Sequence, residues 1–167
     1  RRLVGIGAPD PSLTRYSGMV AVTELVDRLN MITLLDAAIG RIKVRDRGYT
    51  GGQLLVGLAC AQLAGQDFLV GLDRFRADVA GQVLAAVPGL CSTTAAGLAR
   101  RLSEGQWRAV ETGIGDVAAA ALQLLPAARA AALCQAVTID LDTTDVEVYG
   151  RRKRGVAYNH QGQRVGR

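Results

Sequence analysis

At 167 residues, the chain is long enough for one domain, or for one domain and part of a second. Its hydrophobic content of 49% excludes wholesale disorder. Its three cysteines are far apart and form no Cys-x-x-Cys pair, which argues against a disulfide scaffold or a zinc site. The net charge of +5 comes from the C-terminal end, where residues 151–167 carry six basic side chains and no acid, whereas residues 1–150 carry 14 basic and 15 acidic ones. This imbalance favours a polyanionic partner. No stretch is typical of a signal peptide or of a membrane span, so we expect a cytoplasmic protein with no membrane partner.

The first third of the chain predicts two helices. Residues 1–18 contain two prolines and three glycines and predict an irregular lead-in. From Met19, apolar residues recur at helical spacing until Gly40 ends the pattern; they are Val22, Leu25, Val26, Leu29 and Ile32. After a basic, turn-like connector, RIKVRDRGYTGG, a second helix is predicted from about Thr50 to Ala64. It is apolar nearly all round, as a buried central helix would be, and Cys60 is expected in its core.

Further helices are predicted up to Pro126. A short one covers residues 67–79, and another begins after Pro88-Gly89 with Ser92 or Thr93 as its N-cap. The run Ser-Glu-Gly-Gln at 103–106 resembles a capping box, and the helix that it opens continues into an Ala-rich run. We expect Trp107 in the core of the protein.

The pattern changes to strand after Leu133. Apolar and polar residues alternate over residues 137–142, residues 146–149 continue as strand, and the basic run 150–155 predicts a turn. The segment VAYNHQGQRV then predicts a returning strand. We therefore expect a mainly α fold with a C-terminal β-hairpin. Its organisation is a lead-in (1–18), a helical region (19–134) and the start of a β-containing domain (135–167).

Asp140 and Asp142 are the candidate catalytic and metal-binding residues. Residues i and i+2 of a strand share a face, so the two carboxylates lie about 7 Å apart. Paired carboxylates are what Mg²⁺-dependent phosphoryl-transfer enzymes use to hold their metal ions. The spacing equally fits a solvated strand face at a sheet edge, which Thr138 would share.

The basic side chains of the C-terminal segment are the candidate DNA-binding residues: Arg151, Arg152, Lys153, Arg154 and Arg164. Such a cluster can neutralise phosphates, or it can be a solvated hairpin tip. Arg100 and Arg101 fit a phosphate backbone or the C-terminal end of their own helix equally well. His160 has no Cys or Glu at ligand spacing and predicts a surface residue.

The C-terminal string resembles the opening of the catalytic domain in DDE transposases of the IS1380 group, which are relatives of the IS4 superfamily. That group shows an Asp-x-Asp-x-Thr strand, a Val-x-Gly turn, a basic or Gln-rich patch and a Tyr/Asn-rich strand with a Gly. The matching positions here are Asp140, Asp142, Thr144, Val148, Gly150, residues 151–154, Tyr158, Asn159 and Gly162. Upstream, RGYTGGQLLVGLACAQLAGQDFLVGLDRFRAD and CSTTAAGLARRL resemble the helical N-terminal region of the same family.

The resemblance implies an RNase H-like catalytic core whose first strand carries the first acid of a DDE triad. Asp142 matches that acid, with Asp140 as competitor or supporting residue. Mg²⁺ or Mn²⁺, held by the triad in the full-length parent, would promote DNA strand cleavage and transfer. The partners would be transposon ends and target DNA in the bacterial cytoplasm, close to the nucleoid. The helical region would bind transposon ends or help two copies to form a homodimer.

The chain departs from the family after Asp142. The next acids, Asp145 and Glu147, lie too close in sequence to complete a metal pocket. We therefore expect an N-terminal fragment of a transposase that is inactive by itself. The alternative is a non-catalytic helical DNA-binding or interaction module, either a transposase remnant or a truncated inhibitor.

Overall fold

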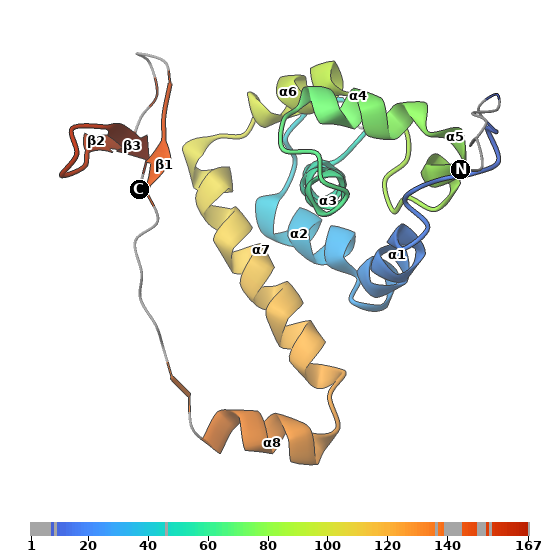
Figure 1. The fold of residues 1–167 in the computed structure, drawn as a ribbon. Helices are drawn as coiled ribbons and strands as arrows, with labels where there is room; N and C mark the ends of the chain where they lie inside the picture. The colour runs from blue at the N-terminus through green and yellow to red at the C-terminus, as the bar shows by residue number, and fades with distance from the viewer. Residues whose placement is uncertain are drawn as a thin grey trace, which may run out of the picture. The chain divides into compact units, whose positions relative to one another are not determined.

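The computed structural model describes residues 8, 10–45, 47–135, 137–138, 145–149, 153 and 155–166. Contacts within the chain divide it into two compact units, Arg1–Pro126 and Ala127–Arg167, which we call the helical unit and the C-terminal unit. Figure 1 shows helices α1 to α7 in the first unit, and α8 with a small sheet in the second. The predicted mainly α fold is confirmed across the described residues.

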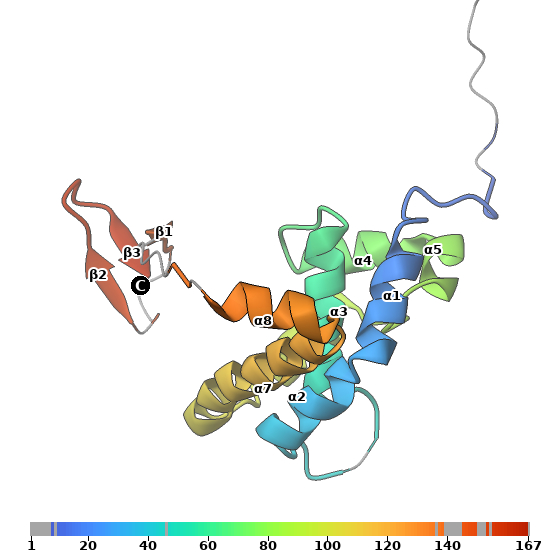
Figure 2. The same ribbon diagram turned by 90° about the horizontal axis from the view of Figure 1, so that it is seen from below.

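The helical unit consists of seven helices in its described part. They are α1 (Met19–Arg28), α2 (Met31–Ile39), α3 (Gly51–Leu63), α4 (Val70–Ala77), α5 (Val79–Val83), α6 (Ser92–Ala99) and α7 (Glu104–Gln123). Figure 2 shows the connection between α2 and α3 as a long loop outside the packed helices.

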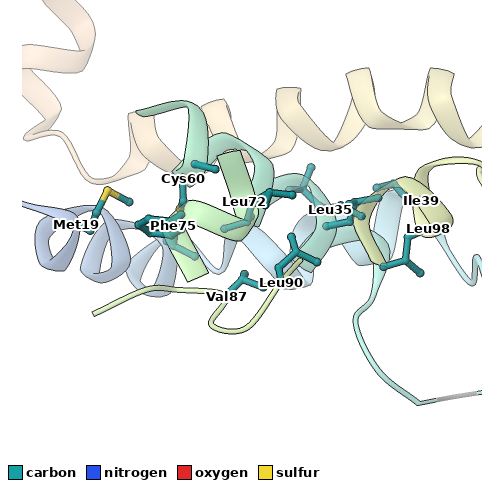
Figure 3. Packing of buried hydrophobic residues seen from close by; sticks show 14 of the residues in the cluster. Met19, Leu35, Ile39, Cys60, Leu72, Phe75, Val87, Leu90 and Leu98 are labelled. Atoms are coloured by element: carbon teal, nitrogen blue, oxygen red, sulfur yellow. The ribbon is translucent and has the colours of Figure 1, made fainter. Parts of the chain in front are cut away.

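Helix α3 is the buried centre of the helical unit, as its nearly all-apolar sequence predicts. Thr50 caps it by accepting a hydrogen bond from the Gln53 N–H, and the Gln53 side chain accepts from the Thr50 N–H in return. Leu54 is fully buried and Cys60 is 3% exposed, so the expected core role of Cys60 is confirmed. Figure 3 shows Cys60 among the buried apolar side chains that neighbouring helices contribute.

The single helix predicted over residues 19–39 is wrong, because it breaks at Asn30. This residue adopts a left-handed backbone conformation with φ of 49°, and α1 and α2 lie on either side of it. Asn tolerates this conformation better than most residues, so the chain can turn here without Gly or Pro. Leu25, which the helical pattern placed on the buried face, is 48% exposed.

The helix predicted over residues 67–79 is present as α4, and a further short helix, α5, begins where the predicted one ends. Asp78 separates α4 from α5 and caps α5, because its carboxylate accepts hydrogen bonds from the Gly81 N–H at 2.8 Å and the Thr14 hydroxyl at 2.6 Å.

The predicted N-cap of α6 is wrong. Cys91 occupies that position, while the N–H and hydroxyl of Ser92 donate to the Asp73 carboxylate on α4.

Helix α7 begins at the predicted capping box and runs unbroken through the Ala-rich segment. Ser103 and Gln106 form both hydrogen bonds of the box. The helix packs along α2, and a Cβ at Gly113 would lie 3.1 Å from Leu35 Cδ2. Trp107 lies one position away from the packed face and is 45% exposed, so its predicted core placement is wrong.

Helices α2 and α3 cross at very short range. A Cβ atom at Gly52 would lie 2.4 Å from the Ile32 carbonyl oxygen. The Gly52 N–H donates to Asp36 Oδ1 at 2.6 Å, so a carboxylate on α2 satisfies one of the free N–H groups in the first turn of α3. The crossing fixes where the loop between the two helices begins and ends.

The C-terminal unit contains α8 (Ala127–Gln135) and the strands β1 (Val146–Glu147), β2 (Val156–Tyr158) and β3 (Arg164–Gly166). The strand order is β1-β3-β2 and both pairings are antiparallel. The described part of the chain therefore forms a three-stranded sheet where we predicted a single hairpin. The expected returning strand is itself the β2–β3 hairpin, and β1 pairs with the second arm of that hairpin.

Candidate nucleic-acid interface

Most of the predicted site lies outside the described residues. This holds for Asp140 and Asp142, the candidate catalytic and metal-binding carboxylates, and for Arg151, Arg152 and Arg154. Of the predicted DNA-binding residues, the structure describes Lys153, which is exposed, and Arg164 on β3.

Arg164 lies beside an exposed aromatic residue. It pairs directly with Tyr158 across the β2–β3 ladder, so the two side chains share one face of the sheet. Tyr158 is 71% exposed and Arg164 is half-buried. A cation next to an exposed ring suits a phosphate and the sugar or base attached to it.

Asn159 organises the turn between β2 and β3. Its side-chain oxygen accepts hydrogen bonds from the Gln161 N–H at 3.0 Å and the Gln163 N–H at 2.9 Å, and its amide donates to Gln163 Oε1 at 3.0 Å. Gly162 has a φ of 74°, which favours glycine. His160 is exposed in this turn, as predicted.

Glu147 and Tyr149, next to the predicted catalytic strand, interact with each other. The Glu147 carboxylate accepts a hydrogen bond from the Tyr149 hydroxyl, and this bond together with the negative charge raises the pKa of Tyr149. Among the described residues, no group of three or more His, Cys, Asp or Glu side chains could hold a metal ion.

A second basic region lies on the helical unit, in the loop of residues 41–47 between α2 and α3. We call it the basic loop. Its sequence, RIKVRDR, contains four basic residues and one acid, Asp46, whose placement lies outside the described residues. The sequence predicted only a connector here, although four cations in seven residues were a visible signal.

The basic loop is anchored at its start. Ile42 is 9% exposed and joins the core. The Gln106 amide on α7 donates to the carbonyl oxygens of Ile39 at 3.2 Å and Arg41 at 3.0 Å. One side chain thus closes the capping box of α7 and holds the C-terminal end of α2.

Two hydrogen bonds from basic side chains close the loop on itself. The Arg41 guanidinium donates to the Val44 carbonyl at 3.2 Å, and the Lys43 ammonium donates to the Arg47 carbonyl. Val44 is 95% exposed at the tip.

Arg101, from the short link between α6 and α7, faces the basic loop across a hollow. Two adjoining pockets share Lys43, Arg47 and Arg101 in their walls, and we call them together the basic cleft. Val44 and Arg45 extend one end of it; Thr93, Thr94 and Gly97 of α6 extend the other. The packing of α7 along α2 brings Arg101 to the loop, which lies more than 50 residues earlier in the sequence.

Cys91 lies at the start of α6 with an unusually acidic thiol. The hydroxyls of Thr93 and Thr94, 3.4 Å and 3.1 Å from its sulfur, lower its pKa to about 7. Burial instead raises the pKa of Cys60. Of these two thiols, only that of Cys91 is substantially ionised at neutral pH.

The helices were compared with membrane spans, and the chain with known proteins. Within the described residues, each helix is too short or too polar to cross a membrane. No protein-family model, curated protein or solved structure matches this chain. The function is therefore inferred from the residues themselves: Asp140 and Asp142, the basic segment with its hairpin, and the basic cleft.

Proposed function

We propose that this chain is the N-terminal part of a DDE-type DNA transposase and that its own residues bind DNA. The observation that carries the proposal is the order of features after α8. The Asp-x-Asp-x-Thr run immediately precedes β1, the basic segment follows, and the β2–β3 hairpin comes next. The Tyr-Asn and Gly positions of the family pattern have physical roles in this hairpin, since Asn159 and Gly162 form its turn.

In this proposal Asp142 is the first carboxylate of the catalytic triad, and Asp140, two residues before it, supports it. A divalent cation, when bound by the full triad, supplies charge stabilisation for an attacking oxygen and a leaving oxygen at phosphorus. The 167 residues supply one end of that site, because Asp145 and Glu147 are the remaining acids after Asp142. Strand transfer belongs to a longer protein that adds a later Asp and Glu on an RNase H-like core.

The second candidate function is a non-catalytic DNA-binding module. The basic cleft favours it, because a cation-lined surface on the helical unit needs no carboxylate to act. Both candidates predict DNA binding by this chain. They differ in whether Asp142 contributes to chemistry in the protein encoded by the complete reading frame.

The test uses the 167-residue chain and the product of the complete reading frame. Each is incubated with Mg²⁺ or Mn²⁺ and a duplex that carries the inverted repeats flanking the gene. We expect the 167-residue chain to bind without cleaving, and the longer product to cleave. Asp142→Asn should abolish cleavage and leave binding intact, whereas Asp145→Asn, a matched control three residues away, should not.

Three outcomes would contradict parts of this proposal. Cleavage by the 167-residue chain that Asp142→Asn abolishes would show that no later acids are required. Cleavage by the longer product that survives Asp142→Asn but not Asp140→Asn would exchange their roles. A longer product that binds the duplex and never cleaves it would favour the non-catalytic module.

A further inference from the structure

The basic cleft concentrates positive charge on an otherwise acidic unit. Its walls and the start of the basic loop contain five cations, Arg41, Lys43, Arg45, Arg47 and Arg101. The other described residues of the helical unit carry six basic and ten acidic side chains. Asp36 lines a neighbouring pocket behind the loop, where Gly52 N–H already donates to it. The field of the unit is therefore positive over the cleft and weakly negative elsewhere.

Two of the five cations hold the basic loop together, and the other three make no such contact. Arg41 and Lys43 donate to backbone carbonyls of the basic loop and so maintain its shape. The guanidinium groups of Arg45, Arg47 and Arg101 form no ion pair or hydrogen bond with other described side chains or backbone groups. By contrast, Arg28 and Arg108, elsewhere on the unit, each pair with a glutamate one helical turn away. Among the residues that the structure describes, nothing occupies these three guanidinium groups, so they can bind a ligand.

We propose that the basic cleft binds the phosphate backbone of double-stranded DNA. This rests on the proposed function in taking DNA as the ligand, and it assigns a second contact surface on the helical unit, separate from residues 151–164. The guanidinium groups of Arg45, Arg47 and Arg101 are of the side-chain type that binds phosphate oxygens, and Thr93 and Thr94 line the same cleft. Gly97 of α6 also lines the cleft, and a Cβ atom there would meet nothing within 4 Å.

The composition of the cleft favours duplex DNA over other polyanions. Tyr49 is the aromatic residue among the described residues of its walls, and its hydroxyl donates to the Pro88 carbonyl at 2.7 Å. A single-strand site typically stacks bases on several rings, so phosphates of a duplex fit better. A membrane-binding loop needs Trp, Phe or Leu to enter the lipid, and here Val44 is the exposed apolar residue of the loop.

The test compares two double variants of the whole 167-residue chain that remove equal charge. Arg47→Gln with Arg101→Gln alters the cleft, and Arg28→Gln with Arg74→Gln alters exposed positions on α1 and α4. Affinity for a 30-base-pair duplex is measured from 50 to 300 mM NaCl. Because each phosphate contact adds about 0.9 to the slope of log K against log salt, the cleft variant should lose about two units of slope and bind between about tenfold and a hundredfold more weakly at 100 mM. The control should stay within about threefold of the wild type. Arg45→Gln with Arg101→Gln is the second cleft variant, and circular dichroism melts verify that each variant is folded.

The outcomes separate this inference from the proposed function. Both folded cleft variants binding like the control would overturn the inference, and the proposed function would stand if Arg151→Gln with Arg152→Gln then abolished binding. A wild-type chain that does not bind duplex DNA at 50 mM salt would overturn both. Vesicles with 30% anionic lipid serve as the competing polyanion; a cleft-dependent affinity for them that exceeds the affinity for DNA would also overturn the inference.

Discussion

Gly52→Ala should strongly destabilise the helical unit, because it adds a methyl group where α2 and α3 cross. The new Cβ would lie 2.4 Å from the Ile32 carbonyl oxygen and 3.0 Å from Asp36 Oδ1. The first of these atoms belongs to the backbone of a helix and cannot rotate away. The helices must separate, which weakens the 2.6 Å hydrogen bond from Gly52 N–H to Asp36.

Two opposing effects set the magnitude. Alanine in place of glycine within a helix is worth about 1 kcal/mol in favour of folding. Overpacking typically costs about 1–3 kcal/mol, and a weakened charge-assisted hydrogen bond adds about 1 kcal/mol or more. We therefore expect the free energy of unfolding to fall by about 2 kcal/mol, a large share of the stability of a small domain.

The assay is urea unfolding followed by the fluorescence of Trp107, which lies in the first turn of α7 and reports on the helical unit. Gly115→Ala is the matched control, since it lies within α7 and a Cβ there meets nothing within 4 Å. It should raise the free energy of unfolding by about 0.5–1 kcal/mol. A Gly52→Ala chain as stable as the wild type would refute the reasoning about the crossing.

Four further predictions follow from individual contacts. Gln106→Ala removes the capping-box partner and the hydrogen bonds to the carbonyls of Ile39 and Arg41, so urea unfolding should show a loss of about 1–2 kcal/mol; Gln106→Glu keeps the capping acceptor and should lose less. Asn159→Ala should speed amide hydrogen exchange at Gln161 and Gln163 by about 5- to 30-fold, whereas Asn159→Asp, which keeps the acceptor oxygen, should preserve protection; equal exchange in both variants would contradict the role of that oxygen. In a Cys134→Ser background, iodoacetamide should alkylate Cys91 with a pH midpoint near 7, and Thr94→Val should move the midpoint upward; an unchanged midpoint would show that the hydroxyl has no effect. The pKa of Asp78 is lowered by the Thr14 hydroxyl and then by the Gly81 N–H, so its contribution to stability is present at neutral pH and is lost as pH falls through the lowered pKa; acid unfolding of Thr14→Val should therefore depend less steeply on pH than that of the wild type.

The helix starts that could be predicted from the sequence depend on neighbouring residues. Ser103 and Gln106 lie three positions apart and bond to each other, so the sequence contains the whole signal. The predicted N-cap of α6 is wrong for the opposite reason. Asp73, 19 residues away in the sequence, binds Ser92, and Cys91 occupies the N-cap position. The break at Asn30 also lacked a local signal, because Asn is compatible with a helix interior as well as with a left-handed turn.

The candidate site was harder to predict because tertiary packing assembles it. The hydrophobic pattern indicated strands at β1 and β2, but strand pairing is set by contacts across the sheet, and β3 lies between them. From the sequence, Arg101 fits a phosphate contact and a partner for the C-terminal end of its own helix equally well. Its proximity to Lys43 and Arg47 depends on the packing of α7 against α2, which the sequence does not reveal.

Both capping boxes of the helical unit use glutamine at their third helical position, Gln53 and Gln106, where glutamate would serve the same bond. Glutamine does not titrate, so these two helix starts keep their capping bond even at acidic pH, where a glutamate would become protonated near its usual pKa of about 4.3. It also brings no negative charge to the base of the basic loop, where Gln106 contacts the Arg41 carbonyl. Helix initiation and attraction of an anionic ligand therefore use different side chains, and the charge of the loop can change without altering how the helices begin.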